Sequence, residues 1–312
     1  MSDGHHHHHH GSGATGKILI ASLVLTLVFV AAEAIAGWFA GSLSLLSDAL
    51  HNLTDAFGLL LAATAFAMER RPANNIKTFG YQRTGVLAAF INALLLVVFS
   101  VFILFESYQR LLNPEPIQDR VMLVMAVIGL VVNLIIAWGL GGHGNDLNLR
   151  ATFLHQIGDA ASCVAIIIGA VVIQYTGWLA IDPILSAIMS VIIIWTAWDI
   201  FKDSLNILLE GLPKGLELAE VHRQIRAVPG VGEVHDLHIW SLGSEASALS
   251  CHLVIDDMQT SQSEAILGTL NRMLASKFHI HHTTVQFEHK RCAAADLCAG
   301  IPTQPSVVRD VH

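Results

Sequence analysis

The chain has 312 residues, of which 53% are hydrophobic and only 13% charged, and its mean hydropathy is +0.56. Soluble domains carry roughly a quarter charged residues, so the composition indicates a membrane protein and excludes disordered, collagen-like and coiled-coil classes. The formal net charge of −8 argues against a nucleic-acid partner, which would require a basic face. The cysteines are too few and too scattered for a secreted disulfide framework: Cys163, Cys251, Cys292 and Cys298.

The first sixteen residues are polar and contain six consecutive histidines, His5 to His10. This run, followed by Gly-Ser-Gly, is equally consistent with a purification tag and with a natural metal-gathering tail. The segment also lacks the apolar core and the cleavage site of a removed signal peptide. We therefore place residues 1–16 outside the fold as a histidine-rich tail or tag.

Six apolar stretches follow, and each is about long enough to cross a hydrocarbon core of roughly 30 Å. A spanning segment must satisfy its own backbone hydrogen bonds, so all six are predicted to be helices: 17–40, 43–67, 84–111, 121–140, 151–175 and 181–209. Basic residues favour one side of the spans, with Lys17, Arg70, Arg71, Lys77, Arg83, Arg150 and Lys202 against Arg110 and Arg120. This bias places the more basic side, and both termini, in the cytoplasm.

Residues 213–291 have the composition of a small soluble domain. Their periodicity predicts helices over 216–227 and 261–278 and strands over 232–242, 246–255 and 283–288. The order α-β-β-α-β is typical of an α+β sandwich with its helices on one face of a short sheet. The predicted fold is an all-α membrane bundle of six transmembrane helices over 17–212, then this domain, then a flexible tail over 292–312.

The second and fifth predicted spans carry the same pair of ionisable residues. His51 and Asp55 are four residues apart, and His155 and Asp159 repeat the spacing. Residues at i and i+4 share a helical face, and ionisable groups inside a span are costly enough to indicate function. Two imidazoles and two carboxylates together suit a tetrahedral Zn²⁺. One such pair alone would equally fit a helix–helix clasp or a proton relay, and the contact between the two helices is itself an inference.

The same groups connect the metal to protons. Metal binding requires neutral histidine and ionised aspartate, so a site open alternately to each side would exchange Zn²⁺ for H⁺. Asp48 lies one turn before His51 on nearly the same face and is a candidate group on the path of protons or metal.

These motifs resemble those of the cation diffusion facilitator family, in its branch of bacterial zinc exporters related to eukaryotic zinc transporters. The resemblance covers about residues 17–291 and rests on GSLSLLSDALHNLTDA, TFGYQR, FLHQIGD, SLNILLEGLP, HDLHIW and TTVQFE. It implies six transmembrane helices, a cytosolic metallochaperone-like domain for regulation and dimerisation, a homodimer, and Zn²⁺/H⁺ antiport across the inner (cytoplasmic) membrane. The implied transport site is His51, Asp55, His155 and Asp159, and histidine at the first position accompanies zinc preference in the family.

The resemblance also implies sites outside the spans. The positions that match cytosolic metal ligands of relatives are His235, His252 and Glu288, which would make Zn²⁺ a regulatory ligand as well as a substrate. A further ligand histidine of some relatives corresponds to Gln286, a poor zinc ligand. Arg83 and Glu210 match a pair that locks the dimer in some members, although both can equally be ordinary membrane-flanking charges.

The sequence therefore predicts a proton-coupled exporter of divalent transition-metal cations, mainly Zn²⁺ with Cd²⁺, Co²⁺ or Fe²⁺ as other candidates, and not an enzyme. One alternative is a membrane-anchored metal sensor without transport, which would have no need of ionisable pairs at mid-membrane. Another is an intramembrane metallohydrolase, but the chain has no His-Glu-x-x-His motif. The Walker A signature is also missing, which argues against ATP as the driving force.

Overall fold

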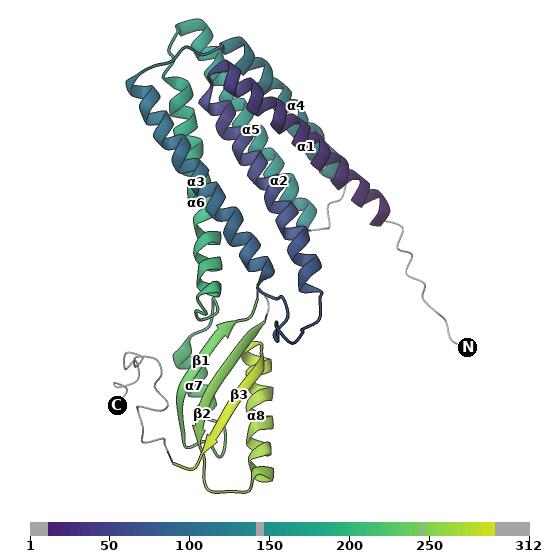
Figure 1. Cartoon of the computed structure of the whole chain (residues 1–312), viewed down its shortest axis with the longest axis vertical. Helices are drawn as coiled ribbons and strands as arrows, with labels where there is room; N and C mark the ends of the chain where they lie inside the picture. The colour runs from purple at the N-terminus through teal and green to yellow at the C-terminus, as the bar shows by residue number, and fades with distance from the viewer. Residues whose placement is uncertain (1–11, 142–146, 244–245, 291–312) are drawn as a thin grey trace, which may run out of the picture. The chain divides into compact units, whose positions relative to one another are not determined.

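The computed structural model describes residues 12–141, 147–243 and 246–290 (Figure 1). The histidine run, and the predicted tail with Cys292 and Cys298, lie outside the described residues. The chain forms two compact units. The first lies within Met1–Leu61 and Ile91–Ile200, and the second within Ala62–Phe90 and Phe201–His312.

Six helices precede the sheet: α1 (Ser12–Ala40), α2 (Leu43–Glu69), α3 (Thr84–Leu112), α4 (Asp119–Gly141), α5 (Leu147–Thr176) and α6 (Ile181–Leu208). Among the described residues, five helices, α2 to α6, are long and apolar enough to cross a membrane. Helix α1 contributes a shorter apolar stretch, Val24–Ala40. Helix α4 packs along α5, and α1 packs against α4. The chain therefore has a helical membrane domain, as its composition predicts.

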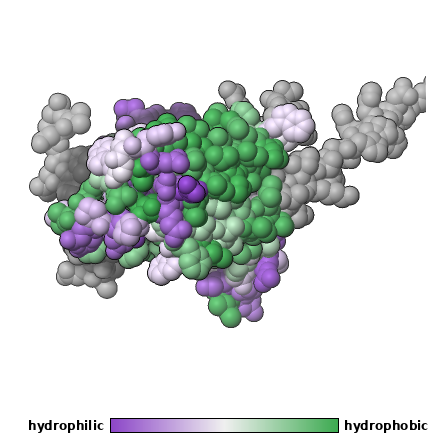
Figure 2. All heavy atoms as spheres, turned by 90° about the horizontal axis from the view of Figure 1, so that it is seen from above, coloured by the Kyte–Doolittle hydropathy of each residue, from purple (hydrophilic) through white to green (hydrophobic). Residues whose placement is uncertain are grey.

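The helices are apolar on their outer faces as well as inside. Small and medium side chains such as Ala126, Ile166 and Ala170 fill the interior, whereas Trp138 and Trp195 are largely exposed. Figure 2 shows a broad, continuous area of hydrophobic side chains on the molecule. A helix that is apolar all round is stable only in an apolar surrounding, which lipid supplies.

A buried carboxylate fixes the start of α2. Asp182, in the first turn of α6, is fully buried and accepts hydrogen bonds from the hydroxyl of Ser42 (2.7 Å), the amide of Leu43 (2.7 Å), and both the amide (3.1 Å) and the hydroxyl (2.5 Å) of Ser44. The first amides of a helix have no intrahelical partner and carry a partial positive charge. Asp182 therefore satisfies these donors and ties α6 to the helix that carries His51 and Asp55.

The second unit contains the predicted α-β-β-α-β order as α7 (Leu218–Arg226), β1 (Glu233–Ser241), β2 (Ser247–Val254), α8 (Thr260–Phe278) and β3 (Ile280–Glu288). The sheet order is β1-β2-β3, with β1 antiparallel and β3 parallel to the central β2. Leu249 and Leu253 of β2 pack with Ile225 of α7 and Leu270 of α8 in one core. Since side chains alternate along a strand, His252 points to the sheet face that the helices leave open.

Cys251 belongs to the buried side of β2. Burial raises the pKa of its thiol to about 12. The thiol is therefore protonated at neutral pH, and it behaves as a small core residue because a metal ligand would have to be a thiolate.

Replacing Asp182 with Ala should leave buried donors of Ser42, Leu43 and Ser44 without an acceptor. We expect the unfolding free energy of the purified protein to fall by about 3 kcal/mol, because hydrogen bonds to a buried charge contribute roughly 1.5–3 kcal/mol each and act together here. Thermal unfolding in detergent measures the change. The control is Asp119→Ala in the first turn of α4, which should cost less than about 1 kcal/mol. Equal melting temperatures for the two variants would contradict the assignment.

Candidate metal sites

Helices α2 and α5 bring together the four residues predicted for the transport site. The Nε2 atom of His51 lies 3.5 Å from Oδ2 of Asp55 and 3.8 Å from Oδ1 of Asp159. The Nε2 atom of His155 lies 3.1 Å from Oδ2 of Asp55 and 3.5 Å from Oδ2 of Asp159. Each imidazole therefore faces both carboxylates. Ligand atoms around a tetrahedral Zn²⁺ at about 2.0–2.1 Å are separated by roughly 3.3 Å, so this spacing suits that ion.

The charge and exposure of this cluster also suit a divalent ion. Two carboxylates with two neutral imidazoles balance a 2+ charge, which matters where water is scarce. The side chain of Asp159 is only 5% exposed, whereas that of His155 is 43% exposed. Within the cluster, Asp159 is thus the buried residue and His155 the more exposed one.

Two further acidic side chains lie in the interior of the first unit. Asp48 is fully buried, and its Oδ2 atom accepts hydrogen bonds from the side-chain amide of Asn52 (3.4 Å) and the thiol of Cys163 (3.9 Å). Glu33 of α1 is also fully buried, beside Asp48. Glu33 was not among the residues predicted from the sequence, although it is the one acidic residue in the predicted span 17–40.

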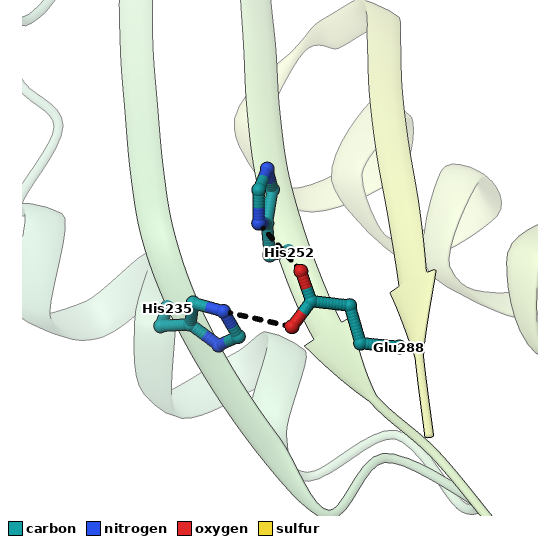
Figure 3. Close-up of side chains that lie close together, drawn as sticks. All are labelled: His235, His252 and Glu288. Carbon is teal, nitrogen blue, oxygen red and sulfur yellow. Dashed lines mark ion pairs between the residues drawn. The ribbon is translucent and has the colours of Figure 1, made fainter. Parts of the chain in front are cut away.

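A second cluster lies on the open face of the sheet, with one residue from each strand (Figure 3). The Glu288 carboxylate of β3 lies 3.1 Å from Nε2 of His235 on β1 and 2.9 Å from Nδ1 of His252 on β2. One donor atom from each lies within 4.8 Å of the other two. Gln286 donates a hydrogen bond of 3.0 Å to Glu288 and so orients it.

The ring nitrogens of this second cluster face the carboxylate without a further hydrogen bond. Nε2 of His235 and Nδ1 of His252 pair with Glu288, and Nδ1 of His235 is buried and has no hydrogen-bond partner among the described residues. Two imidazole nitrogens that converge on one carboxylate fit a metal ligand set. The structure thus brings together all three residues that the resemblance implied.

A β-bulge adds a carboxylate to this face. The β1–β2 register shifts between His235 and His238, and Asp236 within the shift has φ of 49°, in the left-handed region. Its carboxylate lies 3.0 Å from Nε2 of His238 and 3.6 Å from Nε2 of His252. The other ring nitrogen of His252, Nδ1, faces Glu288. Ligand histidines commonly turn their second nitrogen toward a carboxylate, which fixes the tautomer. Asp236 was not among the residues predicted from the sequence, although it stands between two histidines in HDLH.

The structure also brings Arg83 and Glu210 together within one chain. Their side chains form an ion pair at 3.2 Å, and Arg83 donates a second hydrogen bond of 3.2 Å to the carbonyl oxygen of Ser241. Glu210 is 64% exposed, and an exposed pair contributes at most about 1 kcal/mol. The contact joins the segment before α3 to the end of β1.

Comparison with known proteins assigns the chain to a family. The family model of the cation efflux transmembrane domain matches residues 19–209, and that of the cation efflux protein cytoplasmic domain matches residues 213–290. The chain therefore belongs to the cation efflux, or cation diffusion facilitator, family, which is a family of transporters. It is a multi-pass membrane protein for the efflux of metal cations.

Curated relatives cover nearly the whole chain. The metal cation efflux system protein CzcD of Cupriavidus metallidurans is 41% identical over 310 residues, 99% of this chain and 97% of that protein. The cadmium, cobalt and zinc/H⁺-K⁺ antiporter of Bacillus subtilis is 40% identical over 88% of this chain and 90% of its own length. The zinc transporter ZitB of Escherichia coli K12 is 38% identical over 89% of each chain.

A solved structure of the metal-bound C-terminal domain of the CzcD transporter from C. metallidurans is 49% identical. The match covers 23% of this chain and 99% of that domain, with a TM-score of 0.22.

Replacing Asp236 with Ala should lower the Zn²⁺ affinity of the cluster on the sheet by about tenfold to a hundredfold, because His252 loses the group that orients it. Isothermal titration of the purified protein measures the affinity. The protein should lack residues 1–16 and carry Asp159→Ala, so that neither the histidine run nor the membrane cluster contributes. Asp257→Ala, on the exposed segment after β2, is the control. Wild-type affinity in the Asp236 variant would show that the carboxylate has no such role.

Proposed function

We propose that the protein exports Zn²⁺ from the cytoplasm in exchange for protons, by alternating access. The proposal rests on the cluster of His51, Asp55, His155 and Asp159, whose nitrogen and oxygen atoms lie 3.1–3.8 Å apart across α2 and α5. Two nitrogen and two oxygen donors favour Zn²⁺ over the hard ions Mg²⁺ and Ca²⁺. Relatives named as zinc transporters and as a cadmium, cobalt and zinc antiporter support the same cargo, with Cd²⁺ and Co²⁺ as secondary ions.

The exchange follows from competition for the same atoms. A proton on Nε2 of either histidine would face a carboxylate, as the distances of 3.1–3.8 Å allow. Zn²⁺ requires the lone pair of that same nitrogen, so the ion and the proton exclude each other. When the cluster is open to the cytoplasm Zn²⁺ displaces protons, and when it is open to the other side protons displace Zn²⁺.

The proposed setting is the inner membrane, with the protein acting as a homodimer. The transport domain would comprise residues 17–212 with six spans, α1 included, and both termini would lie in the cytoplasm. Residues 213–291 would form the cytosolic regulatory and dimerisation domain. The basic segment that contains Arg70, Arg71, Lys77 and Arg83 supports this orientation.

We further propose that cytosolic Zn²⁺ binds His235, His252 and Glu288 as a regulatory ligand. Two imidazole nitrogens and one carboxylate leave a fourth coordination position open. A bound ion would link all three strands and favour whichever conformation binds it more tightly. Asp48, in the first unit, would lie on the proton path, and Arg83 with Glu210 would hold the cytosolic domain to the loop before α3.

Removal of one anionic ligand should abolish transport. Asp55→Ala or Asp159→Ala should lower Zn²⁺ uptake into proteoliposomes roughly a hundredfold or more, because the 2+ charge loses a partner worth about 3 kcal/mol. The control is Asp203→Ala, an exposed aspartate paired with Lys214. Full uptake in either ligand variant would contradict the site. A wild-type protein that binds Zn²⁺ but carries none would instead favour the membrane-anchored sensor.

Proton coupling predicts a dependence on the pH gradient. An acidic lumen should accelerate Zn²⁺ uptake into proteoliposomes, and uptake should raise the lumenal pH as a trapped fluorescent dye reports. An ionophore that collapses the gradient should remove the acceleration, and Cd²⁺ and Co²⁺ serve as parallel cargoes. Uptake that ignores the gradient and moves no protons would rule out the exchange.

A further inference from the structure

Glu33 and Asp48 form a buried acidic pair between α1 and α2. Both side chains are fully buried, and neither has a Lys, Arg or His within ion-pair distance among the described residues. Both carboxylate oxygens of Glu33 and the Oδ1 atom of Asp48 have no hydrogen-bond partner in that same part of the chain. Neither Glu33 nor Asp48 is one of the four proposed metal ligands.

Two negative charges cannot share such a place without a cation. Burying one unpaired charge costs several kcal/mol, and a like charge beside it adds repulsion. The groups that face the pair are His51 on α2, with Asp159 and Cys163 on α5. Asn133 of α4 lies behind them and donates to the sulfur of Cys163 at 3.6 Å. None of these supplies a permanent positive charge.

The surrounding contacts favour a proton over a metal ion as that cation. Asn52 and Cys163 turn donors, not acceptors, toward Oδ2 of Asp48. Donors stabilise the ionised form of Asp48, and they leave its Oδ1 atom uncommitted. A metal ion would need four or more ligand atoms, whereas one proton between Glu33 and Asp48 forms an O–H···O⁻ hydrogen bond and halves the charge.

We propose that Glu33 and Asp48 are a second cation site, which holds the proton that is exchanged for Zn²⁺. This inference rests on the proposed Zn²⁺/H⁺ exchange. Asp48 is one helical turn from His51, and Glu33 and Asp48 both interact electrostatically with Asp159. A 2+ ion on the four ligands repels the shared proton, and loss of the proton in turn strengthens the attraction for the ion. The two sites are thus coupled by charge without a shared ligand.

The first test uses the full-length protein in proteoliposomes with Zn²⁺ as cargo. Glu33→Gln keeps the size of the side chain but cannot exchange a proton. Zn²⁺ should still bind this variant, while the acceleration by an acidic lumen should fall by about tenfold. Glu33→Asp should recover part of it. Glu115→Gln, an exposed glutamate near Arg110, is the matched control and should behave as wild type.

The second test reads the proton directly in detergent, in wild type, Glu33→Gln and Asp48→Asn. Wild type should show the infrared band of a protonated carboxyl that disappears when Zn²⁺ is added. The band should be missing from Glu33→Gln, which should release about one proton fewer per bound Zn²⁺.

The proposal would be overturned if Glu33→Gln responded to the pH gradient and released protons as the wild-type protein does. If the wild-type protein itself moved no protons, the proposed Zn²⁺/H⁺ exchange would be overturned instead. If Glu33→Gln does not fold, the wild-type infrared band and Asp48→Asn decide the matter.

Discussion

Negative charge inside an apolar bundle is the constraint on which the helical unit depends. Each buried carboxylate there has to find positive charge without bulk water, and the bundle does this in different ways. Asp182 takes the amides and hydroxyls at the start of α2. Asp55 and Asp159 face imidazoles, whose nitrogens can carry protons or release them to a metal. Glu33 has neither solution, and Asp48 has only the donors of Asn52 and Cys163, which is why we propose a mobile cation between the two carboxylates.

This difference separates a structural carboxylate, Asp182, from the carboxylates proposed for transport. A carboxylate satisfied by backbone amides is permanent, because those donors do not leave, and Asp182 therefore serves as an anchor. A carboxylate satisfied by an exchangeable ion is conditional, because its stability depends on what is bound. Helix α2 carries both kinds, with its first turn fixed by Asp182 and with Asp48, His51 and Asp55 further along. The hydrogen bonds of Asp182 therefore anchor the helix that carries the residues proposed to exchange ions.

The sheet of the second unit accommodates its charges differently because its open face can reach water. Histidine and carboxylate alternate there as His235, Glu288, His252, Asp236 and His238, in contacts of 2.9–3.6 Å. Strand pairing places His235 opposite His252, and the bulge adds Asp236 to the same face. The left-handed backbone of Asp236 costs free energy, and aspartate tolerates it better than most residues. The bulge in β1 thus places one more carboxylate next to His235, His252 and Glu288, the proposed metal ligands.

The sequence by itself determined the helical membrane class, the α-β-β-α-β order and the two His-x-x-x-Asp pairs. All of these depend on local periodicity, because i and i+4 share a face of one helix whatever surrounds it. Only the tertiary structure decided that α2 and α5 bring His51 and His155 together, that Glu33 lies against Asp48, and that Asp182 caps α2. These contacts join residues more than ten positions apart in the sequence. Helix periodicity predicts on which face of its own helix a residue lies, but it does not predict which other helix packs against that face. The orientation of Asp236 also needed the structure, because a bulge breaks the alternation from which a strand's faces are predicted.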